Sequence, residues 1–390
     1  MTESKPRRRD LRVALLALLI GATTLVAHAR ASAPQPTSRT PGPGGAPRIE
    51  VAFVLDTTGS MAGLIEGAKR EIWSIANQMV NAQPTPEIRM GLIGYRDRGD
   101  AYVTRAHDLS SDVDGVYAAL RDFAAGGGGD TPESVNQALH EAITRMSWTE
   151  SQDVYKVIFL VGDAPPHMEY AGDVAYAQSV RLARERDIIV NTIQCGDIAG
   201  TEPVWREIAS GGAGRYAAIR ADGGMQALAT PMDEALGRLN RSLADTVIAW
   251  GDAGERAEIE DKRRLALEAD APAAASRLGF FAKLGGLVSS GRADLVDAVK
   301  QGLADVASLD EDALPATLRA MRPEEREDYV KRKLEARNEI QREIAQLSQQ
   351  RDAWIEQEQS KRTAEGRGDG FDRQVLETIR AQAAAKGIAY

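Results

Sequence analysis

The sequence VAFVL at residues 51–55, followed at once by DTTGS at residues 56–60, decides the fold. A short run of aliphatic and aromatic residues is typical of a strand that is buried on both faces of a parallel sheet. The run ends in one carboxylate and two hydroxyls, from Asp56, Thr58 and Ser60. We expect these side chains to lie beyond the carboxyl end of the strand, where open α/β sheets bind their ligands.

Two later segments carry the same kind of side chain. GGGGDTPE at residues 126–133 contains four consecutive glycines, which let a backbone approach a ligand closely. We expect Thr131 to cap a helix over residues 132–147, because proline and glutamate follow it. The apolar run 157–162 predicts a second buried strand, which ends in Asp163. Carboxylate and hydroxyl oxygens suit a small hard cation such as Mg²⁺.

These segments resemble the von Willebrand factor type A family, whose Asp-x-Ser/Thr-x-Ser signature forms a metal-ion-dependent adhesion site that holds Mg²⁺. The resemblance implies that Thr58 and Ser60 bind the cation directly and that Asp56 acts through water. It also implies a ligand from the second loop, Thr131, and a carboxylate at the end of the later strand, Asp163. Mn²⁺ is the alternative cation. The resemblance covers about 200 residues, half of the chain.

Each residue of this site also has a purely structural explanation. Asp56 and Asp163 could be helix N-caps, and Ser60 could accept or donate hydrogen bonds within its own turn. The arrangement of all of them around adjacent strands favours a cation site over that explanation. In the second loop, Asp130 is an alternative ligand to Thr131, and the family pattern does not decide between them.

The composition excludes some classes of partner. The 390 residues carry a formal net charge of −9, which argues against nonspecific binding to nucleic acid or to anionic lipid. The single cysteine, Cys195, cannot form an intrachain disulfide. It follows the predicted strand 188–194, so we expect a packed thiol rather than a reactive one.

The N-terminal residues 1–29 are typical of a secretory signal peptide. A basic leader precedes an apolar stretch from Val13 to about Ala27, and Ala27-His28-Ala29 offers a cleavage site. The sequence therefore predicts export to the periplasm or the exterior, without stable membrane insertion after cleavage. An uncleaved membrane anchor is the alternative. Residues 30–47, rich in proline, glycine, serine and threonine, predict a flexible linker.

Residues 48–245 alternate strands with helices. This order predicts an α/β fold with a doubly wound, mostly parallel sheet. A polar turn after the strand 87–95 predicts that residues 102–106 form an antiparallel strand at the sheet edge. We expect a helix near 223–244 to close this domain and the fragment 48–245 to fold alone.

Residues 252–390 predict an all-α region that belongs to no family we recognise. Its longest segment, about 323–365, has an apolar seam that Arg337 and Arg351 interrupt. A bent helical hairpin or an interaction arm is therefore expected in place of a long coiled coil. Such an arm could join copies of the chain into an oligomer. The last helix is expected to end at Gly387.

The common nucleotide-binding and phosphatase motifs are missing from the sequence. The turn after the first strand has one glycine, and the four glycines from Gly126 lack a following Gly-Lys-Ser/Thr. By the family resemblance, a bound Mg²⁺ would keep one open position for an acidic side chain of a partner protein. We therefore expect an exported, metal-dependent protein-binding module and not an enzyme. The alternatives are a metal-assisted hydrolase, with a general base among Asp97, Asp100, Asp130, Glu133 and His167, or a chelatase-like regulatory subunit.

Overall fold

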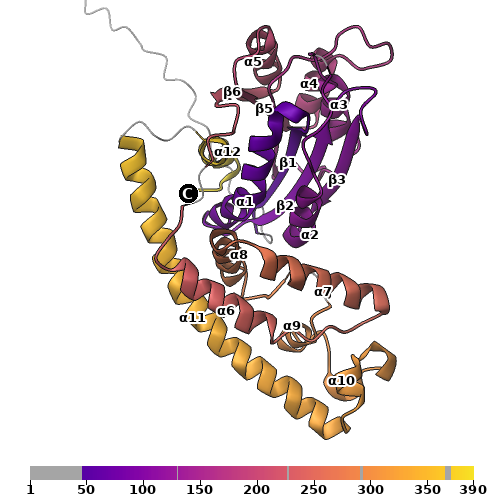
Figure 1. Cartoon of the computed structure of the whole chain (residues 1–390), viewed down its shortest axis with the longest axis vertical. Coiled ribbons are helices and arrows are strands. Elements are labelled where there is room, and N and C mark those ends of the chain that lie inside the picture. Colours follow the sequence, from indigo (N-terminus) through magenta and orange to yellow (C-terminus); the bar gives the residue numbers. More distant parts are fainter. Residues whose placement is uncertain (1–45, 130, 226–227, 290–292, 365–369) are drawn as a thin grey trace, which may run out of the picture. The chain divides into compact units, whose positions relative to one another are not determined.

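The computed structural model describes residues 46–129, 131–225, 228–289, 293–364 and 370–390, in which one sheet lies between helices (Figure 1). The strands are β1 (Arg48–Asp56), β2 (Glu87–Tyr95), β3 (Thr104–Ser110), β4 (Tyr155–Gly162), β5 (Ile188–Cys195) and β6 (Ala213–Ile219). Their order across the sheet is β3-β2-β1-β4-β5-β6. Every neighbouring pair is parallel except β2 with β3. The predicted fold class is confirmed, with the antiparallel edge strand at 104–110 instead of 102–106.

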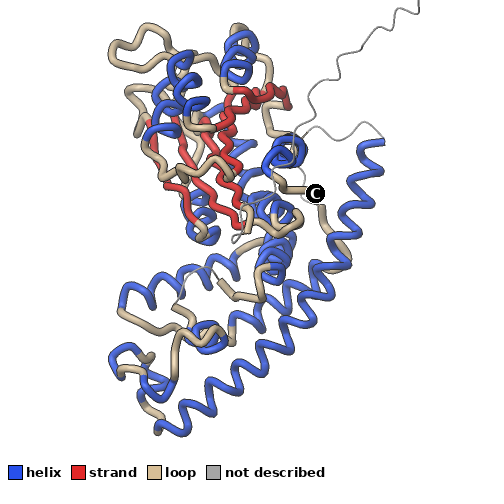
Figure 2. Tube along the Cα trace, turned by 180° about the vertical axis from the view of Figure 1, so that it is seen from behind, coloured by secondary structure: helices blue, strands red, loops and turns tan. Residues whose placement is uncertain are grey.

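Helices cover both faces of this sheet, as the tube view in Figure 2 also shows. They are α1 (Ala62–Met79), α2 (Val113–Arg121), α3 (Val135–Thr144), α4 (Tyr176–Glu185) and α5 (Thr201–Gly211). Successive side chains of a strand point to opposite faces. Val51 and Phe53 of β1 accordingly share a core with α1 and α2, whereas Ala52 and Val54 share another with α3, α4 and α5.

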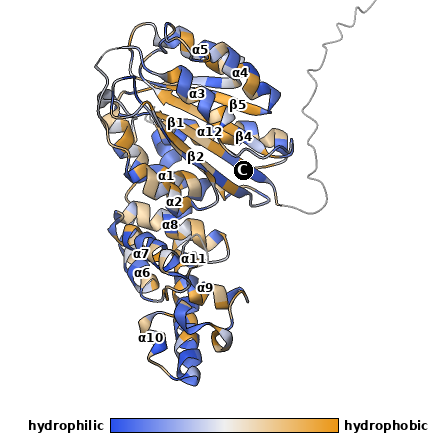
Figure 3. Ribbon diagram, turned by 90° about the vertical axis from the view of Figure 1, so that its right-hand side faces the viewer, coloured by the Kyte–Doolittle hydropathy of each residue, from blue (hydrophilic) through white to orange (hydrophobic). Residues whose placement is uncertain are grey.

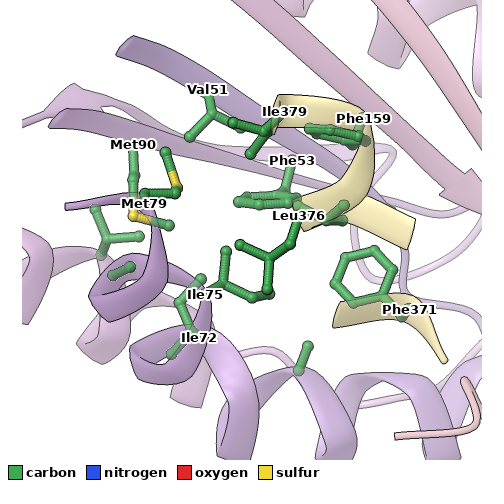
Figure 4. Close-up of a cluster of buried hydrophobic side chains, with 14 of the residues drawn as sticks. Val51, Phe53, Ile72, Ile75, Met79, Met90, Phe159, Phe371, Leu376 and Ile379 are labelled. Atoms are coloured by element: carbon green, nitrogen blue, oxygen red, sulfur yellow. The ribbon is translucent and has the colours of Figure 1, made fainter. Parts of the chain in front are cut away.

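The helix at the C-terminal end of the chain, α12 (Phe371–Ala383), packs on the same sheet as α1. Figure 4 shows Phe371, Leu376 and Ile379 beside Phe53 and Phe159 of the central strands. The rings of Phe53 and Phe371 lie 6.0 Å apart between centroids. The α/β core is therefore completed by a helix that lies far from β6 in sequence.

The helix expected to close the α/β domain lies elsewhere. It is α6 (Asp233–Ala244), which packs with α8 (Ala271–Lys283) and α11 (Pro323–Ala364) through Leu236 and Leu243. The other helices of this region are α7 (Ala253–Glu268), α9 (Leu295–Lys300) and α10 (Ala316–Arg319). Packing thus crosses the predicted boundary between residues 245 and 252 in both directions. Helix α12 packs on the sheet, and α6 packs with the later helices.

The segment expected to form a bent hairpin or an arm is one continuous helix, α11, and the colours in Figure 3 mark many of its residues as hydrophilic. Arg337 is fully buried, and its Nη1 lies 2.6 Å from Asp294 Oδ2 and 2.8 Å from Asp297 Oδ1. Arg351 is also buried and donates to Asp233 Oδ1 at 2.8 Å. Both arginines therefore interrupt the apolar seam because they form buried ion pairs with other helices.

The helical region and the α/β region share a buried contact at α8. Trp73 of α1 packs against the rings of Phe280 and Phe281, with centroids 5.7 and 5.9 Å away. Arg277 of α8 donates to both carboxylate oxygens of Asp114 in α2, at 2.8 and 3.1 Å. An aromatic cluster and a bidentate charged pair in one buried place fix these helices to each other.

Within the described residues, no helix combines the length and the apolar character needed to cross a membrane. The predicted signal peptide, residues 1–29, lies outside them.

Candidate metal centre

The carboxyl ends of β1, β2 and β4 meet at one edge of the sheet. Asp56 at the end of β1 is in register with Tyr95 at the end of β2, and Leu55 is in register with Val161 of β4. Parallel strands place the side chains that follow them at the same edge, so the residues predicted from three distant segments can meet here.

Asp56 is fully buried and has two different carboxylate oxygens. Oδ1 accepts hydrogen bonds from the backbone N–H and the hydroxyl of Thr58, at 2.8 and 2.7 Å. Oδ2 is buried and has no hydrogen-bond partner within the described part of the chain. The hydroxyls of Thr58 and Ser60 lie 3.2 Å apart. Asp56 does not cap α1, whose N-cap is Met61. One oxygen therefore shapes the turn, and the other is left for a ligand.

Burial raises the pKa of Asp56 from 3.8 to about 7. Hydrogen bonds from Thr58 act in the opposite direction, the negative charge of Asp163 raises the pKa further, and Arg96 lowers it. The folded protein thus disfavours a charge at Asp56 until a positive group approaches it.

The glycine-rich loop follows α2 and returns to β1. The N–H of Gly126 donates to the carbonyl of Thr57 at 3.1 Å, and the N–H of Gly59 donates to that of Gly127 at 3.3 Å. Gly127 and Gly128 both have φ = 76°. A Cβ on Gly128 would lie 2.9 Å from the Cβ of Thr58. Both the left-handed backbone and the close approach require glycine here.

The prediction that Thr131 caps the following helix is wrong. Helix α3 begins at Val135, and its N-cap position is Ser134. Thr131 lies before it, outside any helix, and its side chain is exposed. No hydrogen bond within the described ranges joins this side chain to Asp56, Thr58 or Ser60. The alternative second-loop ligand, Asp130, lies outside those ranges.

Asp163 follows the end of β4, the strand that pairs with β1. It comes directly after Gly162 and is buried. A Cβ on Gly162 would lie only 3.2 Å from Oδ2 of Asp56, so this strand end adjoins the unpaired oxygen. The backbone carbonyl of Asp163 accepts a hydrogen bond from the Thr201 hydroxyl at 2.9 Å. This bond fixes the backbone of Asp163 and does not involve its carboxylate.

Glu133, expected above only as a candidate general base, is a further carboxylate near this site. Its side chain is buried, and Oε2 has no hydrogen-bond partner among the residues described. Burial raises its pKa from 4.5 to about 9, and the charges of Asp56, Asp97, Asp100 and Asp163 raise it too. The prolines and glycines around it gave no periodic pattern from which its burial could be predicted.

Asp97 holds two of the neighbouring loops together. Its carboxylate accepts hydrogen bonds from Ser134 Oγ at 2.9 Å and from Tyr170 Oη at 2.7 Å. Burial acts to raise the pKa of Asp97, but these bonds, one from the Arg98 backbone and the charge of His167 outweigh it and lower the pKa. Asp97 is thus a structural carboxylate.

His167 lies in the loop after Asp163 and is buried, with its ring stacked on Tyr170 at 4.2 Å between centroids. Its Nδ1 lies 2.5 Å from Glu169 Oε1, and its Nε2 lies 3.3 Å from Asp97 Oδ2. Only Nδ1 forms a hydrogen bond, to Glu169 in the same loop, and Nε2 is buried without a hydrogen-bond partner among the described residues.

The donor set fits a hard divalent cation. Across the ranges described, no group of three or more His, Cys, Asp and Glu side chains could hold a metal ion by itself. The site combines hydroxyls with carboxylates instead, and one buried carboxylate oxygen of Asp56 is unpaired. Oxygen donors without sulfur or imidazole suit Mg²⁺ or Mn²⁺. Asp56, Thr58, Ser60 and Asp163 are the residues that would hold it.

A doubly wound sheet with this hydroxyl-and-carboxylate turn at its carboxyl edge defines a von Willebrand factor A domain. The family model described as "von Willebrand factor A domain" matches residues 50–230. The matched residues, just under half of the chain, form a von Willebrand factor A domain.

Curated relatives match parts of the chain. The ariadne-like RING finger protein R811 of Acanthamoeba polyphaga mimivirus is 26% identical over 152 residues, 38% of this chain and 14% of that protein. Von Willebrand factor A domain-containing protein 7 of Homo sapiens is 34% identical over 97 residues, 25% of this chain and 10% of that protein. The matched region is thus a small part of each relative.

Among solved structures, proximal thread matrix protein 1 of the mussel byssus is 16% identical, with a TM-score of 0.33, over 45% of this chain and 43% of that one. A second structure of the mussel protein, with a zinc-occupied MIDAS motif, has the same identity and coverage and a TM-score of 0.36. Similarity at this level is too weak to assign roles to individual residues.

Proposed function

We propose that the chain is an exported protein-binding module that uses a divalent cation, Mg²⁺ or Mn²⁺, to recognise an acidic side chain of a partner protein. The observation that carries the proposal is the buried, unpaired Oδ2 of Asp56 beside the hydroxyls of Thr58 and Ser60. A buried carboxylate that keeps one oxygen unpaired is unfavourable by roughly several kcal/mol in its charged form unless it is neutralised or binds a cation.

Each residue has a separate part in this proposal. Thr58 fixes the Asp56 carboxylate through two hydrogen bonds to Oδ1, so that Oδ2 stays available. Asp163 adds negative charge at the same point. Thr58 and Ser60 contribute uncharged oxygens, which leave positive charge on a cation. The bound cation would supply an electrophilic position for an oxygen of the partner.

Export belongs to the proposal because of residues 1–29, with the uncleaved anchor as its alternative. The net charge of −9 disfavours nucleic acid as a partner. Association of copies through α11 is an accompanying hypothesis. Among the candidate bases of the hydrolase alternative, Asp97 is engaged by Ser134 and Tyr170, whereas His167 Nε2 and Glu133 Oε2 have no hydrogen-bond partner in the described chain. A metal-assisted hydrolase therefore stays the alternative function.

The test compares wild type, Asp56→Asn and the control Asp328→Asn, which changes an exposed aspartate on α11. Calorimetric titration with Mg²⁺ and Mn²⁺ is expected to show affinity lowered at least about tenfold in Asp56→Asn and unchanged in the control. The same proteins then serve as bait for envelope proteins, with Mg²⁺ or with EDTA. Equal cation affinity in all three proteins would refute the site, and a partner retained in EDTA would refute metal-dependent recognition.

A further inference from the structure

The second loop brings a carboxylate to the cation site where the family pattern has a hydroxyl. We propose that Glu133, and not Thr131, supplies the second-loop oxygen to the divalent cation. The inference rests on the proposed function and concerns which residue of this chain completes the site. Thr131 is exposed, whereas the Glu133 side chain is only 3% exposed.

The backbone of Glu133 is fixed to the loop that follows Asp163. Its N–H donates to the carbonyl of Pro165 at 3.0 Å, and its carbonyl accepts from the N–H of His167 at 3.0 Å. These two bonds form an isolated parallel β-bridge between Glu133 and Pro166. The residue is therefore held in place before any ligand arrives, and its position does not depend on the start of α3.

The side chain of Glu133 points toward the first loop. A Cβ on Gly128 would lie 3.3 Å from Glu133 Oε1 and 2.9 Å from the Cβ of Thr58. The carboxyl group and Thr58 therefore both lie close to the point that a side chain on Gly128 would occupy. The charges that act on Glu133 from around it are those of the carboxylates of Asp56, Asp97, Asp100 and Asp163.

The neighbouring carboxylates divide into two kinds by their partners. Asp97 accepts from Ser134 and Tyr170, and Asp100 Oδ2 accepts from the backbone N–H groups of Asp97 and Gly128. Those groups tie loops together. Glu133 Oε2 and Asp56 Oδ2, in contrast, are buried without a hydrogen-bond partner in the described chain.

The nearby cation of the protein itself does not fill this role. The guanidinium of Arg96 donates to the carbonyls of Thr57 and Ala124, at 3.1 and 2.5 Å, and stacks over the Tyr102 ring. The carboxylates of the described chain form no metal site by themselves, so an external cation would have to be shared between these two oxygens and the hydroxyls of Thr58 and Ser60. Because Glu133 adds a negative charge where a threonine would not, the site holds its cation without help from a partner.

The experiment measures Mg²⁺ and Mn²⁺ affinity of the full mature chain by calorimetry, together with Tm without metal. The variants are Glu133→Gln, Thr131→Ala and Asp56→Asn. The matched control is Glu71→Gln, which changes another buried glutamate with an unpaired oxygen, in a cavity between α1, α8, α11 and α12. Glutamine keeps the shape of the side chain, so the Tm of Glu133→Gln without metal should be no lower than that of wild type.

We expect Glu133→Gln to lower affinity for both cations by about 10- to 100-fold, while Thr131→Ala and Glu71→Gln stay within about twofold of wild type. Wild-type affinity in Glu133→Gln, or an equal loss in Thr131→Ala, would overturn the assignment of Glu133 alone. If the wild-type chain itself binds neither cation, the proposed function fails.

Discussion

The helical region and the carboxyl edge of the sheet both bury charged side chains, but they differ in what those charges face. In the helical region, Arg337 faces Asp294 and Asp297, and Arg351 faces Asp233. At the sheet edge, Asp56 and Glu133 each keep a buried oxygen without a hydrogen-bond partner, and neither forms a salt bridge within the described chain. Asp294 Oδ2 and Arg337 Nη2 also have no hydrogen-bond partner there, but these two residues form an ion pair.

Charges of the first kind hold helices together, since each is balanced by the protein. Those of the second kind are poorly balanced, and where hydroxyls lie beside them, as Thr58 and Ser60 do beside Asp56, they indicate a site for something that the chain does not supply. Burial alone therefore does not distinguish a structural charge from a functional one. The partner of the charge does.

The largest effect is expected at α12, where a helix from the C-terminal part of the chain completes the core of the sheet. Removal of residues 371–390 takes away the side chains of α12 and its extension that fill the sheet core, namely Phe371, Val375, Leu376, Ile379, Ala383 and Ile388. Their burial is worth roughly 10 kcal/mol, comparable to the whole stability of a domain. We expect the truncated chain to lose cooperative thermal unfolding by circular dichroism.

The fragment 48–245 lacks the same helix, so the expectation that it folds alone is replaced by the opposite prediction. Glu377→Ala serves as the control in the full chain, because Glu377 lies on the half-exposed side of α12 and should change stability by no more than about 0.5 kcal/mol. A truncated chain or fragment that melts cooperatively near the wild-type temperature would show that α12 is dispensable.

The next effect concerns the paired charges. Arg337→Met leaves Asp294 and Asp297 buried without their cation, which should lower the free energy of unfolding by about 3–5 kcal/mol. Arg342→Met, five residues further along α11, removes an exposed pair with Glu339 and should cost about 0–1 kcal/mol. Urea denaturation measures both, and equal losses would mean that the buried pair has no special structural role.

Much of the sheet could be predicted from the sequence because its pattern is local. The apolar run of β1 and the run that ends at Asp163 specify buried strands without reference to the rest of the chain. The position of α12 could not be predicted in this way, since its apolar face matches a helix of either region. The ion pairs of the buried arginines in α11 could not be predicted either, because the aspartates that pair with them lie elsewhere in the sequence.

The residues of the candidate site likewise fall into those that follow strands, which could be predicted, and those of the second loop, which could not. Asp56, Thr58, Ser60 and Asp163 follow directly on strands, and strand register places such residues together. The second loop follows a helix, so no register fixes it. Its conformation depends on the β-bridge between Glu133 and Pro166, a tertiary contact that leaves Thr131 exposed.

The smallest effect tests the unpaired charges through pH. The pKa of Asp56 is raised to about 7 in the folded protein, above its ordinary 3.8, so its neutral form stabilises the fold below about pH 4. That contribution is lost as the pH rises through 7. A cation favours the carboxylate form, and we therefore expect the Tm increase caused by Mg²⁺ to grow from pH 6 to pH 8, by about 2–6 °C.

Glu71→Gln distinguishes the two kinds of pH dependence in this measurement. Burial also raises the pKa of Glu71 to about 7, so this variant should lose part of the pH dependence of Tm without metal. It should keep the full effect of Mg²⁺, because Glu71 belongs to a different cavity. Asp56→Asn should lose the effect of Mg²⁺ at every pH. A Tm increase in Mg²⁺ that is independent of pH would mean that the cation does not bind at the unpaired oxygen of Asp56. The buried charges at the carboxyl ends of the strands would then not indicate a cation site.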